Sequence, residues 1–395
     1  MFNTNQYPYV VVTCTGVVND FPPAVSLVSN LLEIGCRVSL LACGDDSCLP
    51  ISVRNNKQFE FICLGGRGGS LFKRVSMLYK VPHAIRSFLS SRRGEIDIVW
   101  TTMAIDVRDA GRQLYHFAHV MQIAELTERL PAFFHSNRPP YSKLAIKLAR
   151  RASKVVVPEY NRAFIQQTLW RLPETPVVLP NKPSLSSDTP KSLDCELNSR
   201  FERENRKIIL YQGLFADDRD LAPFADAVDS FNGEFVLYLM GKGSDQRQQD
   251  LVEEILSSHS NIEYVGFVPA PNHLVYTRYA RIGLLPYKPS YSGECPPLNA
   301  LYCAPNKIWE YSRFGIPMIG SDVPGLTGIF ARFNCGITAK SNSESIAMAI
   351  REVDSAHDLM SSGSFRLYDS VDTQQIVKGI ISDVLRDTDK MIIAE

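Results

Sequence analysis

The sequence predicts an α/β protein made of two domains, each built around a parallel β-sheet. Short apolar, β-branched segments bounded by turn residues alternate with helical patterns along the whole chain. This alternation is typical of parallel strands joined by crossover helices. The chain has 395 residues, which is long for one hydrophobic core and suits two domains.

The first half of the chain is predicted to hold one sheet and its crossover helices. A helix is expected over 24–35, ending at Gly35. Residues 177–192 interrupt the alternation with Pro, Ser and Asn, a composition typical of a linker. The predicted strands of this half are 9–13, 37–43, 59–64, 96–102, 119–126 and 154–158.

The alternation restarts after the linker and predicts a second sheet. We therefore expect Rossmann-like domains over 1–185 and 186–370, with ligands at the carboxyl ends of the strands and between the domains. Residues 371–395 include an apolar stretch at helical spacing, which could be a last helix that crosses back to the first domain. The predicted strands are 206–213, 235–241, 262–267, 281–287 and 317–321, and helices are expected near 219–230, 246–258, 272–280 and 306–315.

Composition excludes several classes of protein. The 42 Lys and Arg balance the 42 Asp and Glu, so no bulk attraction to nucleic acid is implied. The nine Cys form no C-x-x-C pair, which favours buried thiols in a reducing compartment over a disulfide frame or zinc site. No signal peptide is expected, and no apolar run approaches the roughly 20 residues that span a bilayer. We expect a cytoplasmic protein, or one bound only to a membrane surface.

The stretch YCAPNKIWEYSRFGIPMIGSDVPG at 302–325 carries unusual polar residues in a core-building segment. It predicts a helix over 306–313, with Asn306 as a favourable N-cap. Free N–H groups at a helix start bind anions, and Lys307 adds positive charge there. Glu310, one turn further on, could accept hydrogen bonds from a vicinal diol such as a ribose. Phosphate at the tip and a diol one turn below is the layout of a sugar nucleotide.

The segment PNKIWEYSRFGIPMIGSDVPG resembles the signature of retaining glycosyltransferases of GT-B fold, family 4 type, also described as glycosyl transferases group 1. Three further segments resemble donor-site segments of that family in the same order: LYQGLFADDR at 210–219, LMGKGSD at 239–245 and VGFVP at 265–269. The resemblance covers the second domain well and the first only in outline. It implies two Rossmann-like domains whose sheets face each other across a cleft.

The resemblance also implies roles for individual residues. Arg219 and Lys307 would contact the donor diphosphate and stabilise it as it leaves, in place of a metal ion. Glu310 would hold the ribose, and Glu125 is a candidate catalytic or acceptor-binding residue. No cofactor and no metal are implied. The expected donor-binding residues are Gly213, Gly241, Gly243, Phe267, Val268, Ala304, Asn306, Lys307 and Glu310.

The chain departs from the family pattern at three places. Tyr302 stands where the first Glu of the E-x7-E motif would fall, and Glu294 lies in the loop before it. The common Lys a few residues after Arg219 is missing. The first-domain His has no clear counterpart, although some members place a Glu near the position of Glu125.

Each candidate residue also has a structural interpretation. Glu310 could form a salt bridge within its helix, and Arg219 could be a surface residue among acidic neighbours. Lys307 is harder to explain structurally, because a Lys at a helix start opposes the helix dipole. Asp218-Arg219-Asp220 spells D-x-D, a metal motif of another glycosyltransferase fold that also arises by chance.

A glycine-rich segment and a histidine in the first domain are weaker candidates for ligand binding. GGRGG at 65–69 lacks the spacing of a phosphate-binding loop and is predicted to be a turn. His135 could line the cleft or simply be a satisfied loop residue.

Two segments of the first domain are basic and free of acidic residues. The first, from Arg67 to Arg93, has apolar residues at helical spacing and Pro82 as an expected helix break; the second runs from Arg138 to Lys154. They could be ordinary core-facing helices with solvated cations. They could also dock on anionic lipid headgroups. The residues chosen for membrane docking are Lys73, Arg74 and Lys80.

The sequence thus favours a retaining, metal-independent glycosyltransferase that uses a nucleotide sugar, with a UDP-sugar favoured. The acceptor would be a glycan, and a lipid-linked glycan of surface polysaccharide synthesis is favoured. Two alternatives stay open: a non-catalytic partner subunit of GT-B fold, and a GT-B nucleotide-sugar epimerase that needs no acceptor.

Overall fold

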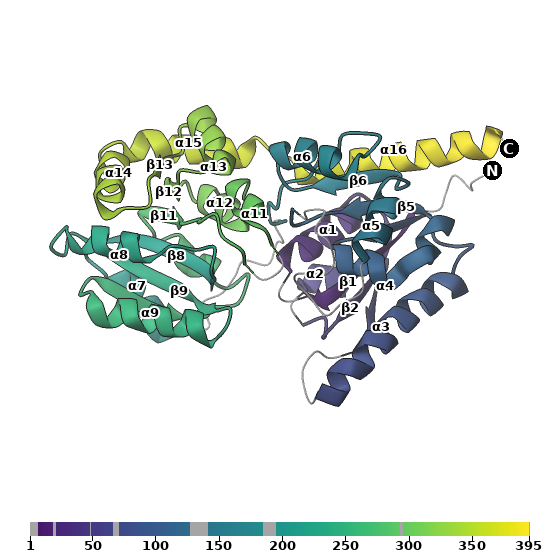
Figure 1. Cartoon of the computed structure of the whole chain (residues 1–395), viewed down its shortest axis with the longest axis horizontal. Coiled ribbons are helices and arrows are strands. Elements are labelled where there is room, and N and C mark those ends of the chain that lie inside the picture. The colour runs from purple at the N-terminus through teal and green to yellow at the C-terminus, as the bar shows by residue number, and fades with distance from the viewer. Residues whose placement is uncertain are drawn as a thin grey trace. The chain divides into compact units, whose positions relative to one another are not determined.

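The computed structural model describes residues 7–18, 21–47, 49–65, 71–126, 141–184, 195–292 and 295–394. The chain divides into two compact units (Figure 1). The first unit comprises Met1–Asp188 together with Asp372–Glu395, and the second comprises Thr189–Val371. The sequence places the boundaries at 185 and 370.

The first unit is built on a seven-stranded sheet in the order β3-β2-β1-β4-β5-β6-β7. All neighbouring strands pair in parallel, as the apolar runs predicted. The order reverses between β1 and β4, so the loops that follow these two strands diverge. The strands are β1 (Tyr9–Val17), β2 (Arg37–Cys43), β3 (Phe59–Cys63), β4 (Ile98–Thr101), β5 (Ala118–Gln122), β6 (Lys154–Val157) and β7 (Val177–Val178).

Helices cover both faces of this sheet. Alternate residues of β1 pack into two separate apolar cores, because successive side chains of a strand point to opposite faces. The last helix of the chain joins the core that α1 covers, where Val377, Ile380 and Val384 are buried. The helices are α1 (Pro22–Glu33), α2 (Ile51–Arg54), α3 (Leu71–Ser91), α4 (Ala104–Ala110), the 3-10 helix η2 (Gly111–His116), α5 (Tyr141–Ala149), α6 (Tyr160–Trp170) and α16 (Thr373–Ala394).

The second unit contains a six-stranded parallel sheet in the order β10-β9-β8-β11-β12-β13. Its order reverses between β8 and β11, so its diverging loops follow those two strands. The strands are β8 (Lys207–Phe215), β9 (Phe235–Gly243), β10 (Ile262–Gly266), β11 (Ile282–Leu285), β12 (Met318–Ser321) and β13 (Gly336–Ala339).

Two apolar cores again lie on the two faces of the sheet. One contains α10 and α12 residues such as Val275 and Ile308, and the other contains α8, α9 and α14 residues such as Phe224 and Val252. The helices are α7 (Cys195–Arg203), α8 (Ala222–Asp229), α9 (Gln246–Ser258), α10 (Leu274–Thr277), α11 (Pro297–Leu301), α12 (Asn306–Ser312), α13 (Pro324–Phe333), α14 (Ser343–Ser355) and α15 (His357–Asp369).

Two sequence predictions about local structure are wrong, and one strand was missed. Pro82 does not break its helix, because α3 continues through it while Val81 and Ile85 on either side pack into the core. Residues 177–178, read as part of a linker, form the edge strand β7 on β6. Strand β13 was missed, since Gly336 and Thr338 interrupt its apolar pattern and only pairing with β12 defines it.

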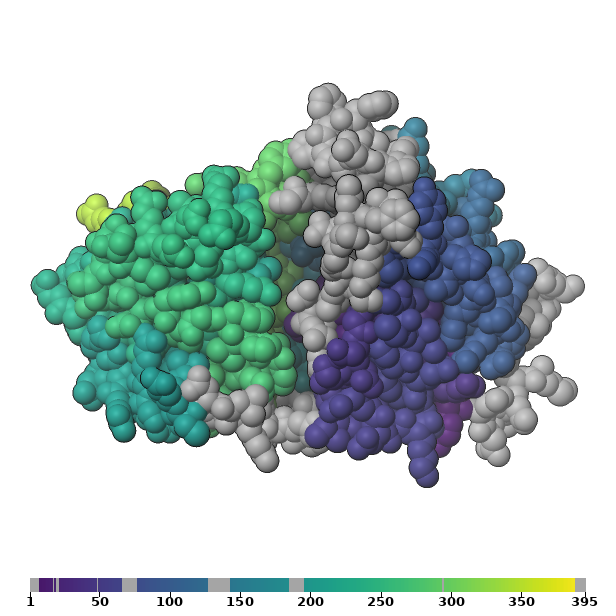
Figure 2. Space-filling model, turned by 90° about the horizontal axis from the view of Figure 1, so that it is seen from below, coloured from purple at the N-terminus to yellow at the C-terminus, as the bar shows by residue number. Residues whose placement is uncertain are grey.

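The basic segments of the first unit fall on α3 and α5. Figure 1 shows one end of α3 projecting beyond the other elements of its unit, and its described part lies among the blue surface atoms of Figure 2. Lys80 is exposed beside Leu78 and Tyr79, which are 52% and 76% exposed. The side chains of Lys73 and Arg74 lie outside the described residues, as does His135. Among the helices described, none has the length and apolarity needed to cross a membrane.

Candidate functional site

The candidate site begins at the carboxyl end of the central strand β8. Gly213 has φ +123°, a conformation that favours glycine. A Cβ at this position would lie 2.7 Å from Cε and 2.9 Å from Nζ of Lys307. Glycine is therefore required both by the backbone and by the lysine side chain that lies against it.

Lys307 projects from the first turn of α12 onto Gly213. Its Nζ lies 5.2 Å from the centre of the Tyr211 ring. Burial lowers the pKa of Lys307 to about 7, and the neighbouring charge of Arg219 acts in the same direction. Within the described part of the chain, the ammonium group forms no hydrogen bond or ion pair. This arrangement leaves a cationic group available to an anion.

Glu310 lies on the same helix and is only 8% exposed. One carboxylate oxygen, Oε2, accepts a 2.5 Å hydrogen bond from Nε2 of Gln212, and Oε1 lies 3.2 Å from Nε2 of His273. Burial acts to raise the pKa of Glu310, but His273, Gln212 and Lys307 outweigh it and hold the pKa below its ordinary value. Glu310 is therefore an ionised carboxylate with two fixed side-chain partners.

The start of α12 differs from the prediction. Asn306 is the first helical residue and not the N-cap, which is Pro305 in an extended conformation with ψ 140°. Proline has no side-chain acceptor, so no side chain caps the helix. The helix is anchored instead by Tyr311, whose hydroxyl donates a 2.9 Å hydrogen bond to the carbonyl of Leu210.

Arg219 follows β8 and contacts several groups. It forms an ion pair with Asp218, and its guanidinium carbon lies 4.1 Å from the centre of the Tyr287 ring. Its Nε and Oδ1 of Asp218 are buried without a hydrogen-bond partner in the described chain. The guanidinium is therefore held in place, while its Nε–H group has no hydrogen-bond acceptor among the described residues.

The D-x-D residues do not converge on one point. Asp218 pairs with Arg219, whereas Asp220 accepts a 2.5 Å hydrogen bond from the hydroxyl of Ser341. Among the described residues, no group of three or more His, Cys, Asp or Glu is placed to hold a metal ion.

The glycines of the second donor segment allow close packing of strands. Gly241 pairs with Gly213, and a Cβ on Gly241 would lie 1.8 Å from the Gly213 carbonyl oxygen. A Cβ on Gly243 would lie 2.7 Å from the backbone of α9. These glycines thus have a packing reason that is independent of any ligand.

Phe267 and Val268 follow β10. Phe267 is 50% exposed, and Nζ of Lys242 lies 4.1 Å from the centre of its ring. Val268 packs partly against the core of the second unit. An exposed aromatic ring next to a lysine offers a flat surface to a planar group.

The structure brings some of the predicted residues together and separates others. Gly213, Lys307 and Glu310 form one cluster with Arg219 and Gly241 nearby. Ala304 is half-buried in the loop before α12. Glu125 belongs to the first unit, is 56% exposed in its side chain and lies 3.7 Å from Nη1 of Arg162. Glu294 lies outside the described residues.

Gln212, His273 and Thr277 were missed by the sequence analysis. Gln212 carried the only signal, as a polar residue in the apolar run of 206–213. His273 and Thr277 lie in a segment without a recognised motif, so only the fold reveals that they approach Glu310.

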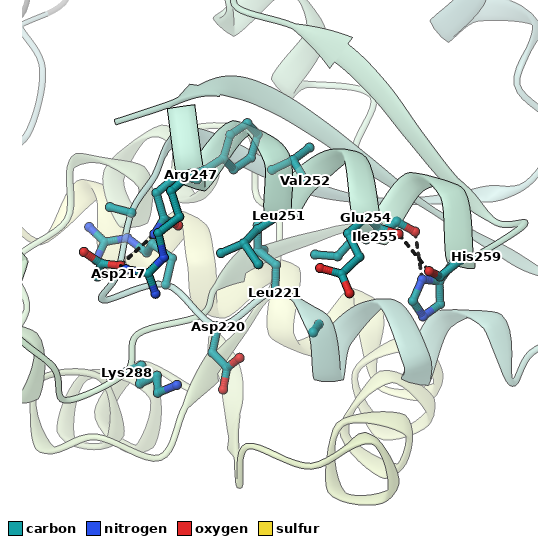
Figure 3. A pocket seen from close by; sticks show the side chains of 16 residues that line it. Asp217, Asp220, Leu221, Arg247, Leu251, Val252, Glu254, Ile255, His259 and Lys288 are labelled. Carbon is teal, nitrogen blue, oxygen red and sulfur yellow. Dashed lines mark hydrogen bonds and ion pairs between the residues drawn. The ribbon is translucent and has the colours of Figure 1, made fainter. Parts of the chain in front are cut away.

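A pocket of about 430 Å³ lies on the α8–α9 side of the same sheet (Figure 3). Asp217 and Arg247 lie at one end, with 3.5 Å between their charged atoms, and His259 lies at the other. Leu251 lies between these ends. Arg219, which follows β8, also lines the pocket.

The chain is similar to one protein family and to several solved structures. Residues 206–354 match the family described as Glycosyl transferases group 1. No curated protein sequence matches the chain significantly.

Solved structures match over nearly the whole chain. Sucrose-phosphate synthase of Thermosynechococcus elongatus is 16% identical with a TM-score of 0.67, over 98% of this chain and 100% of that one. HepE of Anabaena, solved with UDP and glucose, is 12% identical with a TM-score of 0.65, over 94% and 98%. WaaG, a glycosyltransferase involved in lipopolysaccharide biosynthesis, is 16% identical with a TM-score of 0.60, over 94% and 98%.

At such identities the structural matches establish the fold, and the family match lies on the unit that carries Lys307 and Glu310. The protein therefore has the GT-B fold, and residues 206–354 of its second unit match the model of the glycosyl transferases group 1 family.

Proposed function

We propose that the protein is a retaining glycosyltransferase that uses a nucleotide-sugar donor, with a UDP-sugar favoured. The observation that carries this proposal is the pair formed by Lys307 and Glu310 on one short helix. The ammonium of Lys307 is available to an anion, and the carboxylate of Glu310 is ionised although buried. A diphosphate fits the first group and a ribose diol fits the second.

The remaining donor residues fit a nucleotide around this pair. Gly213 and Gly241 are proposed to border the phosphates at the strand ends, and Ala304 and Asn306 lie in the loop and first turn next to Lys307. Phe267 and Val268 would meet the base. The choice of UDP is supported by HepE, which was solved with UDP and with UDP-glucose.

Chemistry at this site would depend on leaving-group stabilisation. As the bond between the sugar carbon and the diphosphate breaks, negative charge grows on the diphosphate, and Arg219 and Lys307 would stabilise it. The acceptor hydroxyl attacks the same face, and its proton passes to the diphosphate oxygen that leaves. Glu125 is proposed to act on the acceptor side. This mechanism requires neither a metal nor a cofactor.

A screen and a transfer assay test the function. Thermal shifts with UDP, GDP, dTDP and CDP identify the base, because binding to the folded state raises the melting temperature. Transfer of labelled sugar to a glycan acceptor then separates a transferase from a non-catalytic subunit, a rival supported by Tyr302 at the position of the first Glu. Conversion of the donor sugar without acceptor would instead identify an epimerase.

The metal requirement has a direct test. Transfer is expected to continue at an unchanged rate in EDTA, because Lys307 and Arg219 supply the positive charge. If EDTA abolished transfer and Mn²⁺ restored it, Asp218 and Asp220 of the D-x-D motif would again be candidate metal ligands.

The acceptor is proposed to be a lipid-linked glycan of surface polysaccharide synthesis, reached from the cytoplasmic face of the membrane. Lys80 lies on the projecting helix α3 beside the exposed Leu78 and Tyr79. Basic and apolar residues side by side favour binding to anionic lipid. The role of WaaG in lipopolysaccharide biosynthesis is consistent with this class of acceptor.

Vesicle sedimentation tests the membrane proposal. The protein is expected to bind anionic vesicles and not neutral ones, with each basic residue adding about 1 kcal/mol that salt screens. Replacing Lys73, Arg74 and Lys80 with Glu should abolish sedimentation and leave nucleotide affinity unchanged, because the donor site belongs to the second unit. A wild-type protein that ignores anionic vesicles at low salt would favour a soluble acceptor.

A further inference from the structure

We infer that Gln212, His273 and Thr277 are positioning residues that hold the Glu310 carboxylate in one orientation for the diol of a ribose. The four residues are called the Glu310 network below. The inference rests on the proposed function, since it takes Glu310 to be the group that meets the ribose.

The direction of each hydrogen bond in the Glu310 network follows from chemistry. An ionised carboxylate only accepts, so the Nε2 amide group of Gln212 must face Glu310 at 2.5 Å. The amide oxygen of Gln212 then faces the Thr277 hydroxyl at 2.7 Å, and the hydroxyl must donate to it. The Thr277 hydroxyl, which also lies 3.1 Å from the carbonyl oxygen of His273, therefore supports this orientation of the Gln212 amide, although it does not touch Glu310.

Burial makes this arrangement sensitive to each member. Thr277 is 0% exposed and Gln212 is 2% exposed. Without the Thr277 hydroxyl, the amide oxygen of Gln212 would be buried without a donor, which is unfavourable. The amide could then rotate and present its oxygen to Glu310, where it would repel the carboxylate.

His273 holds the other oxygen of Glu310. Its Nε2 lies 3.2 Å from Oε1, while its Nδ1 is buried without a hydrogen-bond partner among the described residues. Among the residues that the structure describes, each carboxylate oxygen has one side-chain partner, Gln212 of β8 for Oε2 and His273 at the start of α10 for Oε1. An oxygen of this kind accepts two hydrogen bonds, so one position on each remains for the two hydroxyls of a vicinal diol.

Calorimetry with matched nucleotides tests the positioning role. UDP, GDP, ADP and CDP are compared with their 2′,3′-dideoxy counterparts, and the ratio of the two affinities measures recognition of the diol. Thr277→Val keeps the shape of the side chain and removes the hydroxyl, whereas Thr277→Ser keeps the hydroxyl. We expect the valine variant to lose about fivefold to tenfold of the preference for the ribonucleotide. The serine variant should keep it, and the dideoxy affinity should change in neither.

Three more variants address the other members of the Glu310 network. Gln212→Met and His273→Leu are each expected to lose the diol preference, and His273→Gln, which retains a donor, should restore most of it. Melting temperatures identify any variant that does not fold. A purely structural role would instead lower the affinities for both nucleotides by the same factor, which would overturn the inference.

The outcomes separate this inference from the proposed function. If the wild type binds no nucleoside diphosphate, or if Glu310→Gln keeps the full diol preference, the proposed donor site is wrong and the inference falls with it. If Glu310→Gln loses the preference while Thr277→Val retains it, the donor site stands and the positioning role is wrong.

Discussion

Each unit carries a buried carboxylate near the carboxyl ends of the two strands between which its strand order reverses, but the surroundings of the two differ. In the first unit, Asp106 is 0% exposed and accepts five hydrogen bonds, from the backbone and hydroxyl groups of Thr15 and Thr102 and the backbone of Met103. In the second unit, Glu310 has two side-chain partners and a neighbouring ammonium.

This difference shows how one type of fold uses a polar residue in two ways. Burial raises the pKa of Asp106 to about 6 although its hydrogen bonds oppose the shift, and its five donors belong to β1 and to the loop before α4. Glu310 is held ionised beside Lys307, whose ammonium group has no hydrogen bond or ion pair with the described residues. We conclude that Asp106 stabilises the carboxyl end of its sheet through hydrogen bonds, whereas Lys307 and Glu310 could still contact a ligand.

The largest expected effect comes from removing Asp106. Asp106→Ala leaves buried backbone and hydroxyl donors unpaired, and it should lower the free energy of unfolding by about 3–5 kcal/mol. Urea denaturation measures this loss. Glu310→Gln serves as the matched control and should change stability far less. Equal destabilisation by the two substitutions would contradict the distinction between Asp106 as a structural carboxylate and Glu310 as a carboxylate available to a ligand.

Lys307→Met should separate stability from binding. Loss of the cation is expected to weaken UDP binding by about 2–3 kcal/mol, the scale of a hydrogen bond to a charged group. The same change should raise the melting temperature without ligand, because a buried unpaired charge is removed.

The pH dependence of this stabilisation follows from the pKa of Lys307. Below pH 7 the lysine is charged in both states, so the folded state carries the full penalty of burying the charge. From pH 7 upwards the folded protein binds fewer protons than the unfolded chain, whose lysine keeps a pKa near 10.5, and stability rises. The advantage of the methionine variant should therefore be largest below pH 7 and decline above it. An advantage that grows with pH would contradict the lowered pKa.

Glu310→Gln tests directly whether the Glu310 carboxylate binds a ligand. Affinity for the nucleoside diphosphate should fall by about 1–3 kcal/mol, because a charge-assisted hydrogen bond to the ribose is replaced by a neutral one. The melting temperature should show that the fold survives. Unchanged affinity in calorimetry would mean that Glu310 serves the structure alone.

The smallest expected effect concerns a single donor to Asp106. Thr15→Val removes one hydroxyl donor and keeps the backbone donor of the same residue, so unfolding should become easier by only about 1 kcal/mol. Denaturation midpoints are measured beside those of Asp106→Ala. A loss as large as that of Asp106→Ala would place most of the stabilisation in one hydrogen bond and contradict the distributed arrangement.

The fold and the main cluster were accessible from the sequence for identifiable reasons. Buried parallel strands are nearly continuous apolar runs, and the strands over 37–43 and 235–241 were therefore recognisable. Lys307 and Glu310 could be selected because they are charged residues in a segment that otherwise builds a core. Their spacing on one helix was enough to predict that they lie near each other.

Tertiary structure decided what those residues contact. The sequence made Asn306 the N-cap, but the preceding proline takes that position because its extended backbone starts the helix. Helix α3 passes through Pro82 because packing on both sides of the proline supports it. The Glu310 network joins residues 212, 273, 277 and 310, which come from β8, the N-cap and last residue of α10, and α12. Local patterns report the face and the period of each element, whereas hydrogen bonds between distant elements exist only once the sheet has placed them side by side.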